Sequence, residues 1–152
     1  MSWQIVLWRA LGSAVAILAM QFLAGFGRMP LMLVPFATSI VLVLGTPEAE
    51  PAQPRALVGG HAISTLVGLA VSQALGPSPW AAAIAVGLAM TAMYFTRSFH
   101  PPAGIDPLII VNEQLPFAFL FTTVLPGSLL LLGFAWLWHN AVARGAWPLR
   151  WR

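Results

Sequence analysis

Residues 98–107, with the sequence SFHPPAGIDP, lie between two strongly apolar segments. Pro101 and Pro102 lack an N–H, and each restricts the residue before it to extended conformations. One helix therefore cannot run through this stretch, whereas Pro102 suits the first turn of a new helix. We predict a break followed by a short helix, whose partly positive N-terminus favours anions.

Composition places this break in or at a membrane. Of 152 residues, 59% are hydrophobic and only 7% are charged, whereas a soluble domain carries about 25% charged residues. We predict an all-α integral membrane protein with one domain over residues 1–152. Irregular backbone inside a membrane is tolerated only where protein or water covers it, so the break is the candidate functional centre.

The apolar pattern predicts about six membrane segments. They cover residues 10–26, 31–45, 56–76, 80–96, 102–112 and 116–139. The second and fifth are short helices that begin near Pro35 and Pro102, and we expect Pro126 to interrupt the last. Trp3 and Trp8 precede the first of these segments and suit the membrane interface.

The arginines predict the orientation. With six crossings, all arginines except Arg28 lie on one side of the membrane. The six on that side are Arg9, Arg55, Arg97, Arg144, Arg150 and Arg152. The positive-inside rule then places both termini in the cytoplasm. We expect the protein to span the cell (inner) membrane several times. We expect the first span to be uncleaved, because a clear cleavage site is lacking. The tryptophans and arginines after residue 135 are expected to form an interfacial tail that includes His139.

A weak internal similarity relates the two halves. A shift of 67 residues places 35–43 on 102–110 without a gap. Repeat halves at 10–76 and 77–140 would each hold three crossings, so the second would be inverted relative to the first. Paired broken segments in inverted repeats mark substrate sites in transporters. The alternative is a chance alignment of two apolar sequences.

Three blocks of sequence resemble the HPP family of small integral membrane proteins. The signature block is Thr96-Arg97 followed by His100-Pro101-Pro102-Ala103-Gly104. The block at 54–64, PRALVGGHAIS, resembles a second family block, and PFATS at 35–39 resembles the first. Ala37 departs from the pattern, since we expect glycine there. The resemblance covers residues 10–140 and implies a multi-span, transporter-like protein, with plant chloroplast and cyanobacterial relatives associated with nitrite transport.

The titratable candidates each have two interpretations. His100 either contacts an anion or passes a proton, or it ties down the break by a hydrogen bond. His61 either faces His100 or caps a chain break. Asp106 either stabilises the N-terminus of the short helix, or binds a coupling proton, or pairs with an arginine or histidine.

The remaining candidates are hydrogen-bond donors and cations. Arg55 and Arg97 either attract an anion or anchor the cytoplasmic side. Thr38 and Ser39 either donate hydrogen bonds to a substrate or bond back to their own helix. The predicted substrate-binding set is His100, Pro102, Ala103, Gly104, Asp106, His61, Thr38, Ser39, Arg55 and Arg97.

The sequence holds no cysteine and no glycine-rich phosphate loop, so we expect no enzyme, no cofactor and no metal site. The function predicted is transport of a small inorganic anion, with nitrite first by resemblance, at helix N-termini near the membrane midplane. The alternatives are a structural or regulatory membrane module without transport, and a metal-binding membrane protein, in which residues 61, 100 and 106 would have to converge. The expected partners are the lipid bilayer, the anion and further copies of the chain in a homo-oligomer, with no nucleic acid.

Overall fold

The computed structural model describes residues 2–26, 33–143 and 145–150, and every regular element in these ranges is helical. The elements are α1 (Trp3–Phe26), α2 (Leu33–Gly45), η2 (Glu50–Ala52), η3 (Arg55–Gly59), α3 (Gly60–Leu75), α4 (Pro79–Phe95), η4 (Pro101–Gly104), α5 (Ile105–Glu113), η5 (Leu120–Val124), α6 (Leu125–Leu137) and η6 (Trp138–Val142). The predicted all-α class with about six membrane segments is confirmed.

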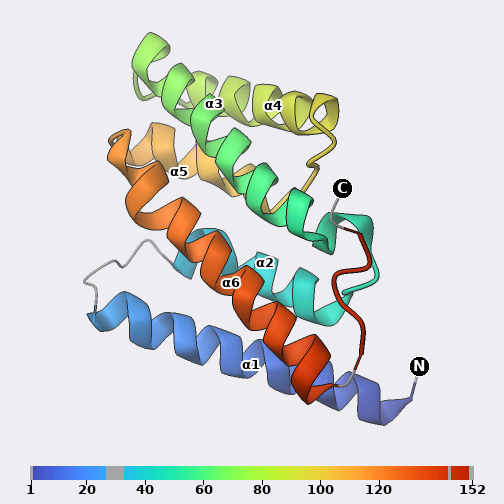
Figure 1. Cartoon of the computed structure of the whole chain (residues 1–152). Coiled ribbons are helices and arrows are strands. Elements are labelled where there is room, and N and C mark those ends of the chain that lie inside the picture. The colour runs from blue at the N-terminus through green and yellow to red at the C-terminus, as the bar shows by residue number, and fades with distance from the viewer. Residues whose placement is uncertain (1, 27–32, 144, 151–152) are drawn as a thin grey trace.

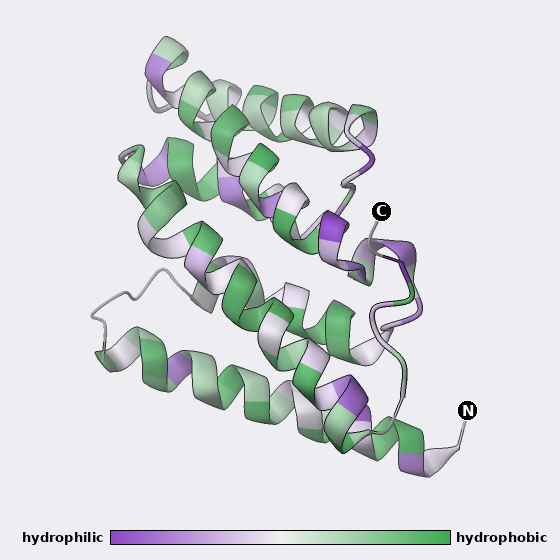
Figure 2. Ribbon diagram, in the orientation of Figure 1, coloured by the Kyte–Doolittle hydropathy of each residue, from purple (hydrophilic) through white to green (hydrophobic). Residues whose placement is uncertain are grey.

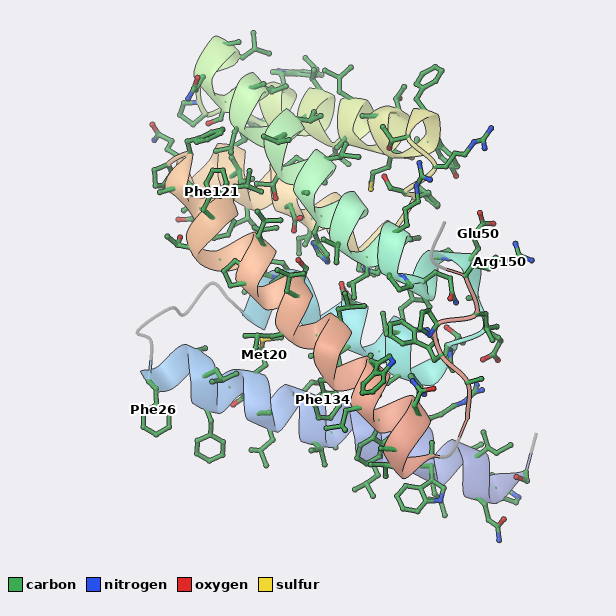
Figure 3. The ribbon with its side chains drawn as sticks, in the orientation of Figure 1. Met20, Phe26, Glu50, Phe121, Phe134 and Arg150 are labelled. Carbon is green, nitrogen blue, oxygen red and sulfur yellow. The ribbon has the colours of Figure 1, made fainter. Side chains whose placement is uncertain are left out.

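Three of the helical segments are long and apolar enough to cross a membrane: Trp3–Phe26, Arg55–Leu75 and Leu120–Val142. The apolar helices Val34–Gly45 and Pro79–Phe95 are shorter. Hydrophobic residues dominate the ribbons in Figure 2. Phe26 of α1 points away from the bundle in Figure 3 and is 86% exposed, as expected for a lipid-facing side chain.

Several polar connections lie at one end of the bundle. Both termini lie at this end in Figure 1, beside the turn that joins α2 to η3. Glu50 and Arg150 lie together there in Figure 3, and the backbone N–H of Arg150 donates to Oε1 of Gln53 over 3.2 Å. This arrangement agrees with an even number of crossings, while the compartment that this end faces stays a prediction. The inverted repeat also stays a prediction.

The predicted break follows α4. Arg97, at φ 53°, turns the chain out of the helix, and the N–H of Ser98 bonds back to the carbonyl of Met93 over 2.9 Å. His100 is extended at φ −130° and ψ 97°. The two prolines after it begin the 3₁₀ turn η4, and α5 follows only at Ile105. The short helix thus starts as predicted, with one 3₁₀ turn before the α-helix.

Glycines on α3 and α6 allow the helices around the break to approach closely. A Cβ on Gly60 would lie 2.6 Å from Cβ of His100, and one on Gly68 would lie 2.7 Å from Cα of Pro107. A Cβ on Gly127 of α6 would overlap the Phe36 ring. The small-residue face at 60, 64 and 68 therefore packs against the segment that the break sets free.

Trp3 and Trp8 lie inside α1, which begins before the predicted span, while their place at the membrane interface stays a prediction. One expectation from the sequence is wrong. Pro126 does not interrupt the last helix, because the π-turn η5 precedes it and widens the turn that the proline ring would clash with.

The tail is also more buried than predicted. Trp147 is only 3% exposed and packs in the core. His139 is 7% exposed, and its Nε2 lies 3.0 Å from the carbonyl oxygen of Val43. The segment after η6 folds back over the end of α2, so Trp147 and His139 pack against protein, while their depth in the membrane stays a prediction. Residues 27–30, which connect the first two predicted segments, and Arg144, Trp151 and Arg152 lie outside the described residues.

Candidate functional site: a buried polar chain behind a basic hollow

Ser39 lies between two histidines. It is the middle residue of α2, and its Oγ lies 2.8 Å from Nε2 of His61 and 2.9 Å from Nε2 of His100. His61 lies in the first turn of α3, and His100 precedes η4. Three segments distant in the sequence thus meet at one hydroxyl group.

Asp106 extends this contact on the far side of His61. Its Oδ2 lies 2.8 Å from Nδ1 of His61. The hydroxyl of Thr65 donates to the same oxygen over a longer distance, 3.4 Å. His61 and Thr65 share one face of α3 because they are four residues apart. Asp106 is in the first turn of α5, where an acid also stabilises the helix N-terminus.

The backbone of the η2 turn closes the other end. Nδ1 of His100 lies 2.7 Å from the carbonyl oxygen of Pro51. We call Asp106, His61, Ser39 and His100 the buried polar chain. All four residues are 0% exposed. The Phe36 ring covers the ring of His61, with centroids 4.7 Å apart, so the chain is shielded by apolar side chains.

The amide groups at the start of η4 are largely in use. Pro101 and Pro102 have no N–H, and the N–H of Ala103 bonds to the carbonyl of His100 over 3.0 Å. The Ala103 carbonyl accepts from the hydroxyl of Ser64 over 2.6 Å. This N-terminus therefore presents fewer free donors than an ordinary helix.

A hollow of about 650 Å³ lies at the end of the bundle that carries the termini. Its lining residues are Glu50, Pro51, Gln53, Arg55, Ala56, Tyr94, Arg97, Phe99 and Arg150. Three arginines against one glutamate make it basic. Pro51 lines the hollow and bonds to His100, and Phe99 lines it next to His100 in the chain, so the hollow adjoins the buried polar chain. We call it the basic hollow.

The structure brings most of the predicted residues to these two places. Ser39, His61, His100 and Asp106 form the buried polar chain, while Arg55 and Arg97 line the basic hollow. Ala103 is buried beside the chain, and Pro102 and Gly104 are half-buried. Thr38 is exposed on α2 and takes no part in the chain.

Sequence reasoning missed Pro51, Thr65 and Gln53. The side-chain amide of Gln53 donates to the carbonyls of Pro47 and Ala49, and its Oε1 accepts from the backbone of Leu149 and Arg150. It therefore ties the η2 turn to the tail. For Thr65 the signal was its spacing of four from His61; for Pro51, whose carbonyl is the partner, no sequence signal exists.

Metal binding is not favoured by this geometry. Each ring nitrogen of His61 and His100 already has a hydrogen-bond partner. Within the described ranges, no group of three or more histidine, aspartate or glutamate side chains is arranged to hold a metal ion.

One known family matches this sequence. The family model described as "HPP, transmembrane region" matches residues 1–148. The chain belongs to this HPP family. The resemblance drawn from the His-Pro-Pro block is thereby confirmed over almost the whole chain.

Two transmembrane proteins of Dictyostelium discoideum are similar to this HPP chain. One is 34% identical over 156 residues, covering 95% of the chain and 55% of the relative. The other is 39% identical over 124 residues, covering 76% of the chain and 40% of the relative. The HPP chain thus spans about half the length of these relatives, or less. No solved structure matches it.

Proposed function

We propose that this HPP protein transports a small inorganic anion across the membrane, with nitrite as the first candidate. The observation that carries the proposal is the basic hollow, which adjoins the buried polar chain through Pro51 and Phe99. Buried ionisable groups inside membrane segments are costly and are kept mainly for function.

The hollow supplies the attraction for an anion. Arg55, Arg97 and Arg150 line one concave surface, and a cleft lined by one sign of charge raises the local concentration of the opposite ion. Arg55 is held in place, since its Nη2 donates to the carbonyl of Thr96 over 2.7 Å. An anion in the hollow meets His100 once the Pro51 carbonyl moves aside. Binding at the helix N-termini remains part of the proposal. The hydrogen-bond donors to the anion come chiefly from the arginines of the basic hollow and from the histidines of the buried polar chain.

The test is uptake of nitrite, nitrate and chloride into liposomes that contain the purified protein. Protein-free liposomes give the background, because nitrous acid crosses bilayers unaided. We expect protein-dependent flux of at least one of the three anions. Absence of flux for all three contradicts transport and favours a structural or regulatory module.

A charge series at Arg97 tests the hollow. Arg97→Gln is expected to raise the KM for the anion by about 2- to 10-fold with little change in maximal rate, as for a removed steering charge. Arg97→Lys keeps the charge and serves as the matched control. An equal effect of both substitutions would assign Arg97 to ending α4 and not to anion attraction.

A further inference from the structure

We propose that the buried polar chain binds one exchangeable proton, and that this proton is the coupling ion of the transport proposed above, on which this inference rests. The protein would then move one proton together with one monovalent anion. The argument is a count of hydrogens along four short contacts.

The count begins at Pro51. A carbonyl oxygen only accepts hydrogen bonds, so Nδ1 of His100, 2.7 Å away, carries a hydrogen. In a neutral His100 the other nitrogen, Nε2, then accepts the hydroxyl hydrogen of Ser39 over 2.9 Å. A hydroxyl has one hydrogen, so Ser39 has none left for His61. A longer contact of its Oγ to the Pro35 carbonyl, at 3.3 Å, competes for the same hydrogen.

The count ends at Asp106. The 2.8 Å contact between Ser39 Oγ and His61 Nε2 therefore needs a hydrogen from His61. The 2.8 Å contact between His61 Nδ1 and Asp106 Oδ2 needs another. Two neutral histidines, one hydroxyl and an ionised Asp106 supply one hydrogen too few for the four contacts. The observed geometry is complete only when the chain holds one additional proton.

Charge favours the same state. With the additional proton the chain is neutral overall, as an imidazolium–carboxylate pair or as a carboxylic acid beside a neutral ring. Without it, the chain carries one negative charge on side chains that are all 0% exposed. Oδ1 of Asp106 is also buried without a hydrogen-bond partner among the described residues. An isolated buried carboxylate is strongly unfavourable.

Charges on the neighbouring elements do not replace this proton. The sequences of α2 and α6 contain no charged residue, and His61 is the one titratable residue of α3. Glu50 and Arg55, from η2 and η3, lie in the basic hollow, as does Tyr94 of α4. Glu113 is exposed at the far end of α5.

The contacts also provide a route for the proton. The Nε2 hydrogen of His61 passes to Oγ of Ser39, and the hydroxyl hydrogen passes to Nε2 of His100. The positive charge then lies on His100, whose ring centroid is 5.1 Å from that of His61. The transfer moves protons only, and no group is oxidised or reduced. His100 adjoins the basic hollow through Pro51, so the proton is released where the anion arrives.

The first test measures the proton without transport. Nitrogen NMR of ¹⁵N-histidine protein in lipid, with His139→Gln to remove the third histidine, reports which ring nitrogens carry hydrogen. Carbon NMR of ¹³C-aspartate protein reports in the same way on Asp106, the one aspartate in the sequence. We expect either one imidazolium ring beside an ionised Asp106, or two neutral rings beside a protonated Asp106. Two neutral rings beside an ionised Asp106 overturn the proposal, whichever nitrogen of His61 carries its hydrogen.

The second test measures coupling. An inward gradient of one pH unit is expected to raise the protein-dependent initial rate of nitrite uptake several-fold, and one-to-one coupling drives up to about tenfold accumulation. Asp106→Asn keeps all four contacts, because its amide nitrogen can donate to His61, but it cannot release the proton. We expect this variant to lose the response to the gradient. Glu113→Gln, the same change on the same helix, should keep it.

The third test cuts the route. Ser39→Ala removes the atom that joins the two rings and should also abolish the gradient response. Thr38→Ala removes the neighbouring exposed hydroxyl and should leave it intact. Nitrite flux that is indifferent to the gradient, with Asp106→Asn unchanged from wild type, overturns the coupling and leaves anion transport standing. Absence of flux in wild type refutes transport and coupling together, while the NMR result still decides whether the chain holds the proton.

Discussion

His61 and Asp106 are 45 residues apart in the sequence, yet Nδ1 of the first lies 2.8 Å from Oδ2 of the second, and neither side chain is exposed. The pair joins the start of α3 to the start of α5. It thereby fixes the position of α5 relative to α3.

We expect truncation of Asp106 to cost more stability than an isosteric change at the same position. Asp106→Ala leaves Nδ1 of His61 buried without a partner and should cost about 1–3 kcal/mol of unfolding free energy. Asp106→Asn retains a partner and should cost much less. Thermal unfolding in detergent measures both. Equal losses for the two variants would indicate that the shape of Asp106, and not its hydrogen bond, is what the fold requires.

The glycines beside the break should be intolerant of a methyl group. Gly68→Ala places its Cβ 2.7 Å from backbone Cα of Pro107, which cannot shift alone, so we expect a loss of about 1–3 kcal/mol. Gly87→Ala is the matched control, because nothing lies within 4 Å of its Cβ. The helix there should gain up to about 1 kcal/mol from the substitution. Urea or thermal unfolding of the two variants side by side gives the comparison.

Topology is the third prediction. The end of the bundle that carries both termini also carries Arg55, Arg97 and Arg150, so the positive-inside rule assigns it to the cytoplasm. Reporter fusions at residue 48 and at the C-terminus should report a cytoplasmic location, and a fusion at residue 77 a periplasmic one. A periplasmic C-terminal reporter would contradict the six-crossing arrangement.

The ion pair of Glu48, in the turn after α2, should make the unfolding free energy slightly dependent on pH in the acid range. A hydrogen bond from its own backbone N–H and the nearby Arg9 guanidinium hold the pKa of the Glu48 carboxyl below its ordinary value. Arg9 Nη2 lies 2.9 Å from Oε2 of Glu48. Because the folded pKa is lowered, the stabilisation is present above the ordinary pKa and is lost as the pH falls through the folded value.

The side chain of Glu48 is 60% exposed, so the effect should be about 0.2–1 kcal/mol. Glu48→Gln should lower the unfolding temperature at pH 7 and make little difference at strongly acid pH. Glu50→Gln, a neighbouring exposed carboxylate, is the control. A Glu48→Gln effect that is the same at both pH values would rule out the ion pair as its cause.

The sequence by itself determined the elements that local chemistry controls. Low charge and long apolar runs require membrane helices, because an exposed backbone cannot be satisfied in lipid. Pro101 and Pro102 force the break after α4, since they lack the N–H that a helix needs. The candidate residues Ser39, His61, His100 and Asp106 were also identified from the sequence, as ionisable or hydroxyl-bearing side chains in apolar segments.

Only the tertiary structure decided which of these residues meet. Ser39 and Thr38 are neighbours on α2, and the rotation of that helix turns the first into the buried polar chain and the second outward. That rotation depends on Phe36 filling the space at Gly127, and the position of His100 depends on its approach to Gly60. The burial of Trp147 and His139 likewise follows from how the tail folds over α2. Such contacts join residues far apart in the chain, and an apolar sequence has the same local pattern whichever face packs inward.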